Sequence, residues 1–230
     1  MIASFKRHSI IKRALETNKI SIETIDYRDY AANKHHKVDD TPYGGGAGMV
    51  LMVQPIFDAL KAIKTAEAKT ILLCPTGRPF KQEEANKLAQ EKELIFICGH
   101  YEGYDERIRS YVDFEYSIGD YVLTSGELSG MVMIDAIARL VPGVIEAESY
   151  QSDSFQNGLL EYPQYTKPRI FAGQEVPEVL LNGHHARINE YRLTQSIIKT
   201  MKQRPDLLEN DNLSLEIKAK IKELKDKKII

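Results

Sequence analysis

The sequence has few cysteines, no long apolar segment and no strong excess of either charge, and these absences exclude several classes of protein. Cys74 and Cys98 are the two cysteines in 230 residues. Both lie within apolar runs, so we expect reduced, buried thiols and no disulfide framework. No stretch approaches the roughly 20 apolar residues of a membrane span, and residues 1–8 lack the apolar core of a signal peptide. We therefore expect a cytoplasmic protein that does not contact membranes.

Several catalytic and metal-binding motifs are also missing. The sequence has no P-loop, no nucleophile elbow and no paired-cysteine zinc pattern, which removes the usual support for an NTPase, a hydrolase or a zinc domain. The pairs His35–His36 and His184–His185 lack a Cys or carboxylate at zinc-ligand spacing, so the residues predict no metal site. The glycine-dense segment 43–49 does not follow an apolar strand and is therefore no dinucleotide fingerprint. It is either a flexible turn or a loop that contacts substrate.

Residues 1–145 alternate strand and helix patterns. Residues 20–25 are β-rich, and residues 71–74 and 94–98 are short apolar runs typical of parallel strands covered on both faces. Residues 53–63 carry an apolar stripe, and residues 81–91 consist of strong helix formers. Strands that alternate with helices predict an α/β fold with a mostly parallel sheet.

One further helix is expected over residues 128–140, which are apolar on most sides. Such a helix is either deeply buried or an oligomer contact. Thr124 and Glu127 have the spacing of a capping box at its start, and Pro142–Gly143 would stop it.

The pattern changes after this helix. Residues 146–168 are polar and aperiodic, which is typical of a linker or functional loop. Residues 190–202 and 213–227 have helical patterns, so residues 169–230 are expected to form a small all-α domain after an α/β domain at 1–145. Residues 165–230 carry 13 Lys or Arg against 9 Asp or Glu. This basic balance suits a nucleic-acid backbone, but a solvated helical surface is the more common explanation.

Residues 95–130 are the most informative stretch. Two short apolar runs each end in a turn that mixes glycine with acidic residues, as at Gly99, Glu102 and Gly103. Small ligands bind at the strand ends of open α/β sheets, and glycine lets the backbone approach them closely. The segment therefore predicts a pocket for a small polar ligand.

Six long motifs together resemble the bacterial tRNA (guanine-37-N1)-methyltransferase family. The similar segments cover nearly the whole chain, and motifs of this length and order are very specific. They are residues 34–49, 97–107, 117–123, 153–161, 165–168 and 176–185.

The resemblance implies a fold and a set of ligands. The α/β domain would carry the deep trefoil knot of the SPOUT class, and the C-terminal helical domain would help to grip tRNA. Family members work as homodimers whose active sites combine both subunits, and they bind S-adenosylmethionine in the knot. Carried over by position, the cofactor-binding residues would be Leu73, Pro75, Gly77, Gly99, Glu102, Ile118, Gly119, Asp120, Tyr121, Val122, Leu123 and Gly126.

The same resemblance assigns the chemistry to Asp153 and Arg139. Guanine N1 is a poor nucleophile until it loses its proton, which a carboxylate can accept as general base. Negative charge then develops towards O6, where a cation is stabilising. Asp153 matches the base and Arg139 the cation. From residue type alone, an Asp in a polar loop is more often an N-cap or turn residue. The resemblance also suggests that Mg²⁺ assists, although no spacing here shows its site.

The chain departs from the family pattern in three places. Relatives begin with an apolar strand followed by Leu-Phe-Pro-Glu-Met, and Met1 aligns with that Met, so the first strand is expected to be missing. Thr76 stands where Gln is common, and Ser125 where Gly is common. The segment 139–153 is one residue shorter than in some relatives. Two alternatives stay open: a knotted methyltransferase for another RNA position, and an RNA-binding protein that keeps the fold without catalysis.

Overall fold

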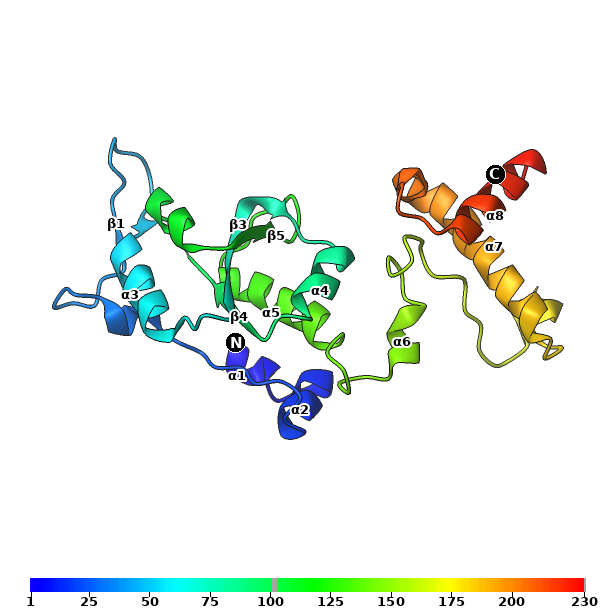
Figure 1. Cartoon of the computed structure of the whole chain (residues 1–230), viewed down its shortest axis with the longest axis horizontal. Helices are drawn as coiled ribbons and strands as arrows, with labels where there is room; N and C mark the ends of the chain where they lie inside the picture. Colours follow the sequence, from blue (N-terminus) through cyan, green and yellow to red (C-terminus); the bar gives the residue numbers. More distant parts are fainter. Residues whose placement is uncertain (101–102, 230) are drawn as a thin grey trace. The chain divides into compact units, whose positions relative to one another are not determined.

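The computed structural model describes residues 1–100 and 103–229. Two compact units make up the chain, Met1–Glu146 and Ala147–Ile230 (Figure 1). No helix within the described residues is both long and apolar enough to span a membrane.

A parallel sheet forms the centre of the first unit. Its strand order is β4-β3-β5, with β3 (Ala68–Pro79) between β4 (Glu93–Ile97) and β5 (Phe114–Ser117). Both pairings are parallel. The expected α/β class with a parallel sheet is therefore confirmed, as are the strands expected at 71–74 and 94–98.

Two strand assignments differ from the expectation. Residues 20–25 contain no strand, because no neighbouring strand hydrogen-bonds to them, and the carbonyl of Ile22 instead accepts from Nζ of Lys6 at 2.6 Å. Strand β5 is an addition to the predicted strands, although Phe114 and Tyr116 show the alternation of a strand.

Helices pack around the sheet (Figure 1). Helices α3 (Val53–Ile63), α4 (Gln82–Leu88) and α5 (Gly126–Ala138) correspond to the three expected helices. Helix α5 packs against β3, β4 and α4. The core between α3 and the sheet consists of Val38, Leu51, Ile56, Leu60, Leu72, Ile97 and Ile108.

The capping box expected at Thr124 is wrong. Helix α5 begins after Ser125, which is the N-cap residue in an extended conformation, and its hydroxyl makes no capping bond to the helix backbone. The helix is also only partly buried. Met133 and Ile137 are buried, whereas Leu128 and Val132, one turn apart, are 37% and 51% exposed.

The remaining elements of the first unit are short. They are α1 (Ile2–Phe5), α2 (Ser9–Glu16), η1 (Tyr27–Tyr30), β1 (Asp39–Asp40), β2 (Val50–Leu51) and η2 (Glu106–Tyr111).

The second unit is built around two helices, α7 (His185–Gln203) and α8 (Leu215–Asp226). Its core contains Leu159, Ile197, Leu213, Ile217, Ile221 and Leu224. Leu159 and its buried neighbour Leu160 come from the polar segment expected as a linker. The hydroxyl of Thr200 accepts from the backbone N–H of Leu160 at 2.9 Å, so it joins this segment to α7. The shorter elements are α6 (Ala147–Gln151), β6 (Ile170–Phe171), β7 (Gln174–Glu175), η3 (Glu178–Leu180) and η4 (Pro205–Glu209).

Candidate active site

Two chain segments meet at the carboxyl end of the parallel sheet. Strand β4 ends at Ile97, two residues before Gly99. Helix α5 begins at Gly126, which lies against Gly99. The N–H of Gly126 donates to the carbonyl of Gly99 at 2.8 Å. A Cβ on Gly126 would lie 2.7 Å from the backbone nitrogen of Gly99, so no side chain fits between them. Because both residues are glycines, the backbone after β4 and the backbone at the start of α5 can be in direct contact.

Tyr104 bridges the ends of two neighbouring strands. Its hydroxyl lies 3.1 Å from the carbonyl of Leu73 on β3 and 3.2 Å from that of Ile97 on β4. Burial raises the pKa of Tyr104 far above its ordinary value, so it stays a neutral donor. A Cβ on Gly99 would lie 2.5 Å from the Tyr104 ring. Gly99 is therefore needed for the ring to reach both carbonyls.

A polar pair lies beside the two glycines. Nε2 of His100 lies 2.8 Å from Oε1 of Glu127, in the first turn of α5. Burial raises the pKa of Glu127, but hydrogen bonds from His100, the backbone and Ser125 outweigh it, and the pKa lies below the ordinary value. The other carboxylate oxygen of Glu127 is buried without a hydrogen-bond partner among the described residues. An ionised carboxylate thus stands next to the glycine contact.

The remaining expected cofactor residues lie on strand β3 and in the loop after β5. Leu73 is buried in β3, whereas Pro75 is exposed and Gly77 half-buried further along the strand. Gly77 touches β5 closely, because a Cβ there would lie 2.6 Å from the backbone nitrogen of Tyr116.

The loop after β5 contains the others. It turns at Gly119, whose carbonyl accepts from the N–H of Tyr121 at 2.9 Å and from the hydroxyl of Ser117 at 2.9 Å. A Cβ on Gly119 would lie 2.3 Å from the Tyr121 ring. Ile118 and Leu123 are half-buried, and the exposed members are Asp120, Tyr121 and Val122. Glu102 lies outside the described residues.

The two residues expected to carry the chemistry belong to different units. Arg139 is the half-buried C-cap residue of α5. Asp153 is half-buried in the second unit, just after α6, where its N–H donates to the carbonyl of Tyr150 at 3.1 Å. In the part of the chain that the structure describes, no group of three or more His, Cys, Asp or Glu side chains could hold a metal ion.

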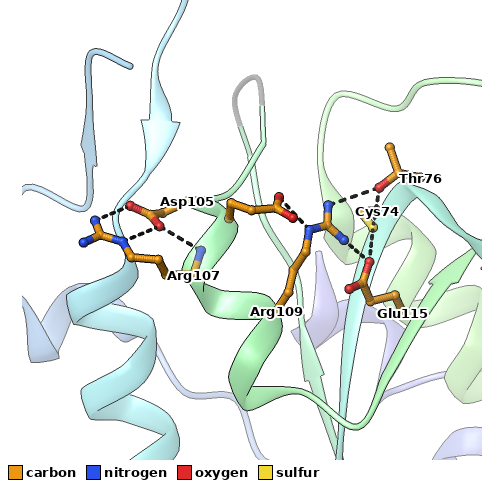
Figure 2. Close-up of polar contacts among 7 residues, drawn as sticks. Cys74, Thr76, Asp105, Arg107, Arg109 and Glu115 are labelled. Carbon is orange, nitrogen blue, oxygen red and sulfur yellow. Dashed lines mark hydrogen bonds and ion pairs between the residues drawn. The ribbon is translucent and has the colours of Figure 1, made fainter. Parts of the chain in front are cut away.

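The site contains further residues that the sequence patterns did not single out. Tyr104 and His100 lie within the 97–107 motif, next to predicted residues. Arg109 and Glu115 contact Thr76 and Cys74 on β3 (Figure 2). No spacing rule predicts these contacts, since they join residues distant in the sequence.

The fold and this site define an α/β protein with closely packed glycines at the carboxyl end of its parallel sheet, followed by a helical unit. A model of the tRNA (Guanine-1)-methyltransferase TrmD family matches residues 1–210. The chain belongs to this family. Both the expected family membership and the expected class of enzyme, a methyltransferase, are confirmed.

Curated relatives are similar along nearly their whole length, and each is called tRNA (guanine-N(1)-)-methyltransferase. The relative from Desulforamulus reducens is 53% identical over 225 residues, which cover 95% of this chain and 89% of the relative. The relative from Staphylococcus carnosus is 56% identical over 91% of this chain and 86% of its own length. The relative from Macrococcus caseolyticus is 54% identical over 95% of this chain and 92% of its own length.

Proposed function

We propose that the protein transfers a methyl group from S-adenosylmethionine to N1 of guanine 37 in the anticodon loop of tRNA. The observation that carries the proposal is the backbone contact between Gly99 and Gly126 at the carboxyl end of the sheet, in a chain of this family. This contact lies at the carboxyl ends of the parallel strands, where open α/β sheets bind small ligands. The proposed pocket combines this contact with the β3 segment 75–77 and the loop 118–123.

S-adenosylmethionine, when bound, supplies a methyl group on a positively charged sulfur. Several features of the pocket fit it. Backbone N–H and C=O groups at the strand ends suit its polar adenosine and amino-acid parts. The ionised Glu127 beside Gly99 adds negative charge near a cationic ligand.

The residues of this chain would then prepare the guanine. Asp153 accepts the proton of N1, and the electron pair left on N1 forms the new bond to the methyl carbon while the bond from that carbon to the sulfonium sulfur breaks, so that the sulfur leaves as a neutral thioether. Arg139 stabilises the negative charge that develops at O6. The target base must leave the anticodon-loop stack to reach these groups, as in other base-modifying enzymes. No step is assigned to Mg²⁺.

The proposal extends to architecture and partners. The β4–α5 region would form the trefoil knot of the SPOUT class, and the helical unit would grip tRNA. The exposed Leu128 and Val132 on α5 support a homodimer, because apolar side chains one helical turn apart form a packing surface. We place the reaction in the cytoplasm, where tRNA is found.

Methyl transfer to two tRNA transcripts that differ only at position 37 tests the reaction. We expect labelled methyl incorporation with guanine 37 and none with adenine 37, together with a reverse-transcription stop at that base, because a methyl group on N1 blocks pairing. Equal incorporation into both transcripts, or none into either, would refute the proposal.

Asp153→Asn tests the role of the base. We expect kcat to fall by a factor of about 10² to 10⁴, the usual range for loss of a general base, while the Kd for S-adenosylmethionine changes less than about twofold. Asp211→Asn, an exposed acidic residue of the same unit, is the control and should keep full activity. A weakened Kd in Asp153→Asn would instead assign Asp153 a structural role.

A further inference from the structure

Strand β3 contains a bulge at residues 74–77, which we call the β3 bulge. In the pairing with β5, Leu73 and Arg78 both align with Tyr116, so the four residues between them have no ladder partner on β5. Pro75 and Gly77, two of the expected cofactor contacts, lie within it. Ladder hydrogen bonds do not fix the backbone there, so its conformation depends on the packing of Gly77 against Tyr116 and on side-chain contacts.

Arg109 of η2 supplies such a contact from outside the strand. Its Nη2 donates to Oγ1 of Thr76 at 3.2 Å. Oγ1 of Thr76 also lies 3.3 Å from Sγ of Cys74, which in turn lies 3.7 Å from Oε2 of Glu115. Figure 2 shows Arg109 pointing to the bulge from the η2 helix, between Thr76 and Glu115.

Two carboxylates fix the orientation of this guanidinium. Nε donates to Glu106 at 2.8 Å, and Nη1 forms an ion pair with Glu115 on β5. The side chains of Arg109 and Glu115 are only 30% and 27% exposed. Because the guanidinium is planar, the two ion pairs aim the remaining donor at Thr76. A lysine carries its three N–H donors on a single nitrogen, so it could not reproduce the planar spread of donors that meets these three groups.

We infer that Arg109 is a positioning residue for the cofactor pocket, acting through the hydroxyl of Thr76 to hold the β3 bulge. The inference rests on the proposed function, since the bulge matters only if it lines the S-adenosylmethionine site. It also gives Thr76, which replaces a Gln common in the family, a defined task in this chain.

Calorimetric titration with S-adenosylmethionine tests the inference. We expect the Kd to rise about tenfold in Arg109→Met, about what loss of a hydrogen bond from a charged donor costs. Arg109→Lys should weaken binding similarly, because it keeps the charge but loses the fork. The value of kcat at saturating cofactor should stay within about twofold, since Arg109 does not touch the reacting atoms.

Thr76 offers a matched pair of variants. Thr76→Val keeps the shape of the side chain and removes its hydroxyl, so it should weaken binding by about three- to tenfold. Thr76→Ser keeps the hydroxyl and should bind nearly as the wild type does. The double variant Thr76→Val/Arg109→Met should bind no more weakly than Arg109→Met, because both changes break one contact.

Arg107→Met is the control for Arg109. Arg107 lies on the same helix but points away from the bulge to Asp105 (Figure 2), so its Kd should match the wild type. Equal weakening in Arg107→Met, equal binding by Thr76→Val and Thr76→Ser, or independent losses in the double variant would each overturn the inference. If Arg109→Met does not fold, the Thr76 pair decides alone. A wild type that binds no S-adenosylmethionine would refute the proposed function instead.

Discussion

Replacing Gly99 with alanine introduces a single methyl group where the structure leaves no room for one. The added Cβ would lie 2.5 Å from the ring and hydroxyl of Tyr104. Overpacking of this kind costs about 1–3 kcal/mol. If the ring moves away, the hydrogen bonds to the carbonyls of Leu73 and Ile97 are lost, at about 1 kcal/mol each. Reduced freedom of the unfolded chain offsets about 0.4–1 kcal/mol. We therefore expect a net destabilisation of roughly 2–4 kcal/mol.

Urea unfolding of four proteins measures this coupling: the wild type, Gly99→Ala, Tyr104→Leu and the double variant. Leucine is shorter than tyrosine, so the new methyl group should cost less than about 1 kcal/mol in the Tyr104→Leu background. The same cost in both backgrounds would show that Gly99 is needed for another reason, and the steric argument would fail. S-adenosylmethionine binding by Gly99→Ala should weaken in parallel, because the displaced ring disturbs the strand ends.

Two further predictions concern a titration and a buried hydroxyl. The pKa of Glu127 in the folded protein lies below its ordinary value of 4.5, so its carboxylate stabilises the fold above about pH 4.5, and this contribution disappears as the pH falls through the lowered pKa. Unfolding free energies measured between about pH 3 and 6 should therefore fall less steeply in Glu127→Gln than in the wild type, and identical slopes would contradict the assignment. In the second unit, Thr200→Val leaves the buried N–H of Leu160 without its acceptor, which should cost about 1–3 kcal/mol in urea unfolding. Thr200→Ser should restore most of it, and equal loss in both variants would show that packing, not the hydrogen bond, matters.

The regular elements of the fold follow from local patterns. The apolar run at 71–74 and the stripe at 53–63 become a strand and a helix, because burial of each requires that geometry. Residues 20–25 have a comparable β pattern but no neighbouring strand. A strand depends on hydrogen bonds to a partner, and a single segment carries no information about whether one is present.

The part of β3 after Cys74 cannot be predicted from the sequence because it contains prolines. Pro75 and Pro79 argue against a continued strand after Cys74, since proline donates no ladder hydrogen bond. The structure places Pro75 in the bulge and Pro79 at the end of β3, opposite Ser117. The strand thus resumes beyond an interruption at the point where ligand contacts are expected.

Some residues around Gly99 and the β3 bulge can be predicted from the sequence, and others cannot. Gly99 can be identified from the sequence because a glycine directly after a buried strand usually marks a close approach of the backbone, and its contacts with Tyr104 and Gly126 give that prediction a steric basis. Arg109 cannot be identified in the same way, because it reaches Thr76 across 33 positions of sequence. Glycines in the sequence mark where the backbone closely approaches other atoms. The charged residues that hold such a backbone in place can be identified only when the strand pairing and its register are known. In this protein the strand register indicates where to look for such a residue. Leu73 and Arg78 of β3 both align with Tyr116, and the bulge between them needs a contact from outside the strand to stay in one conformation.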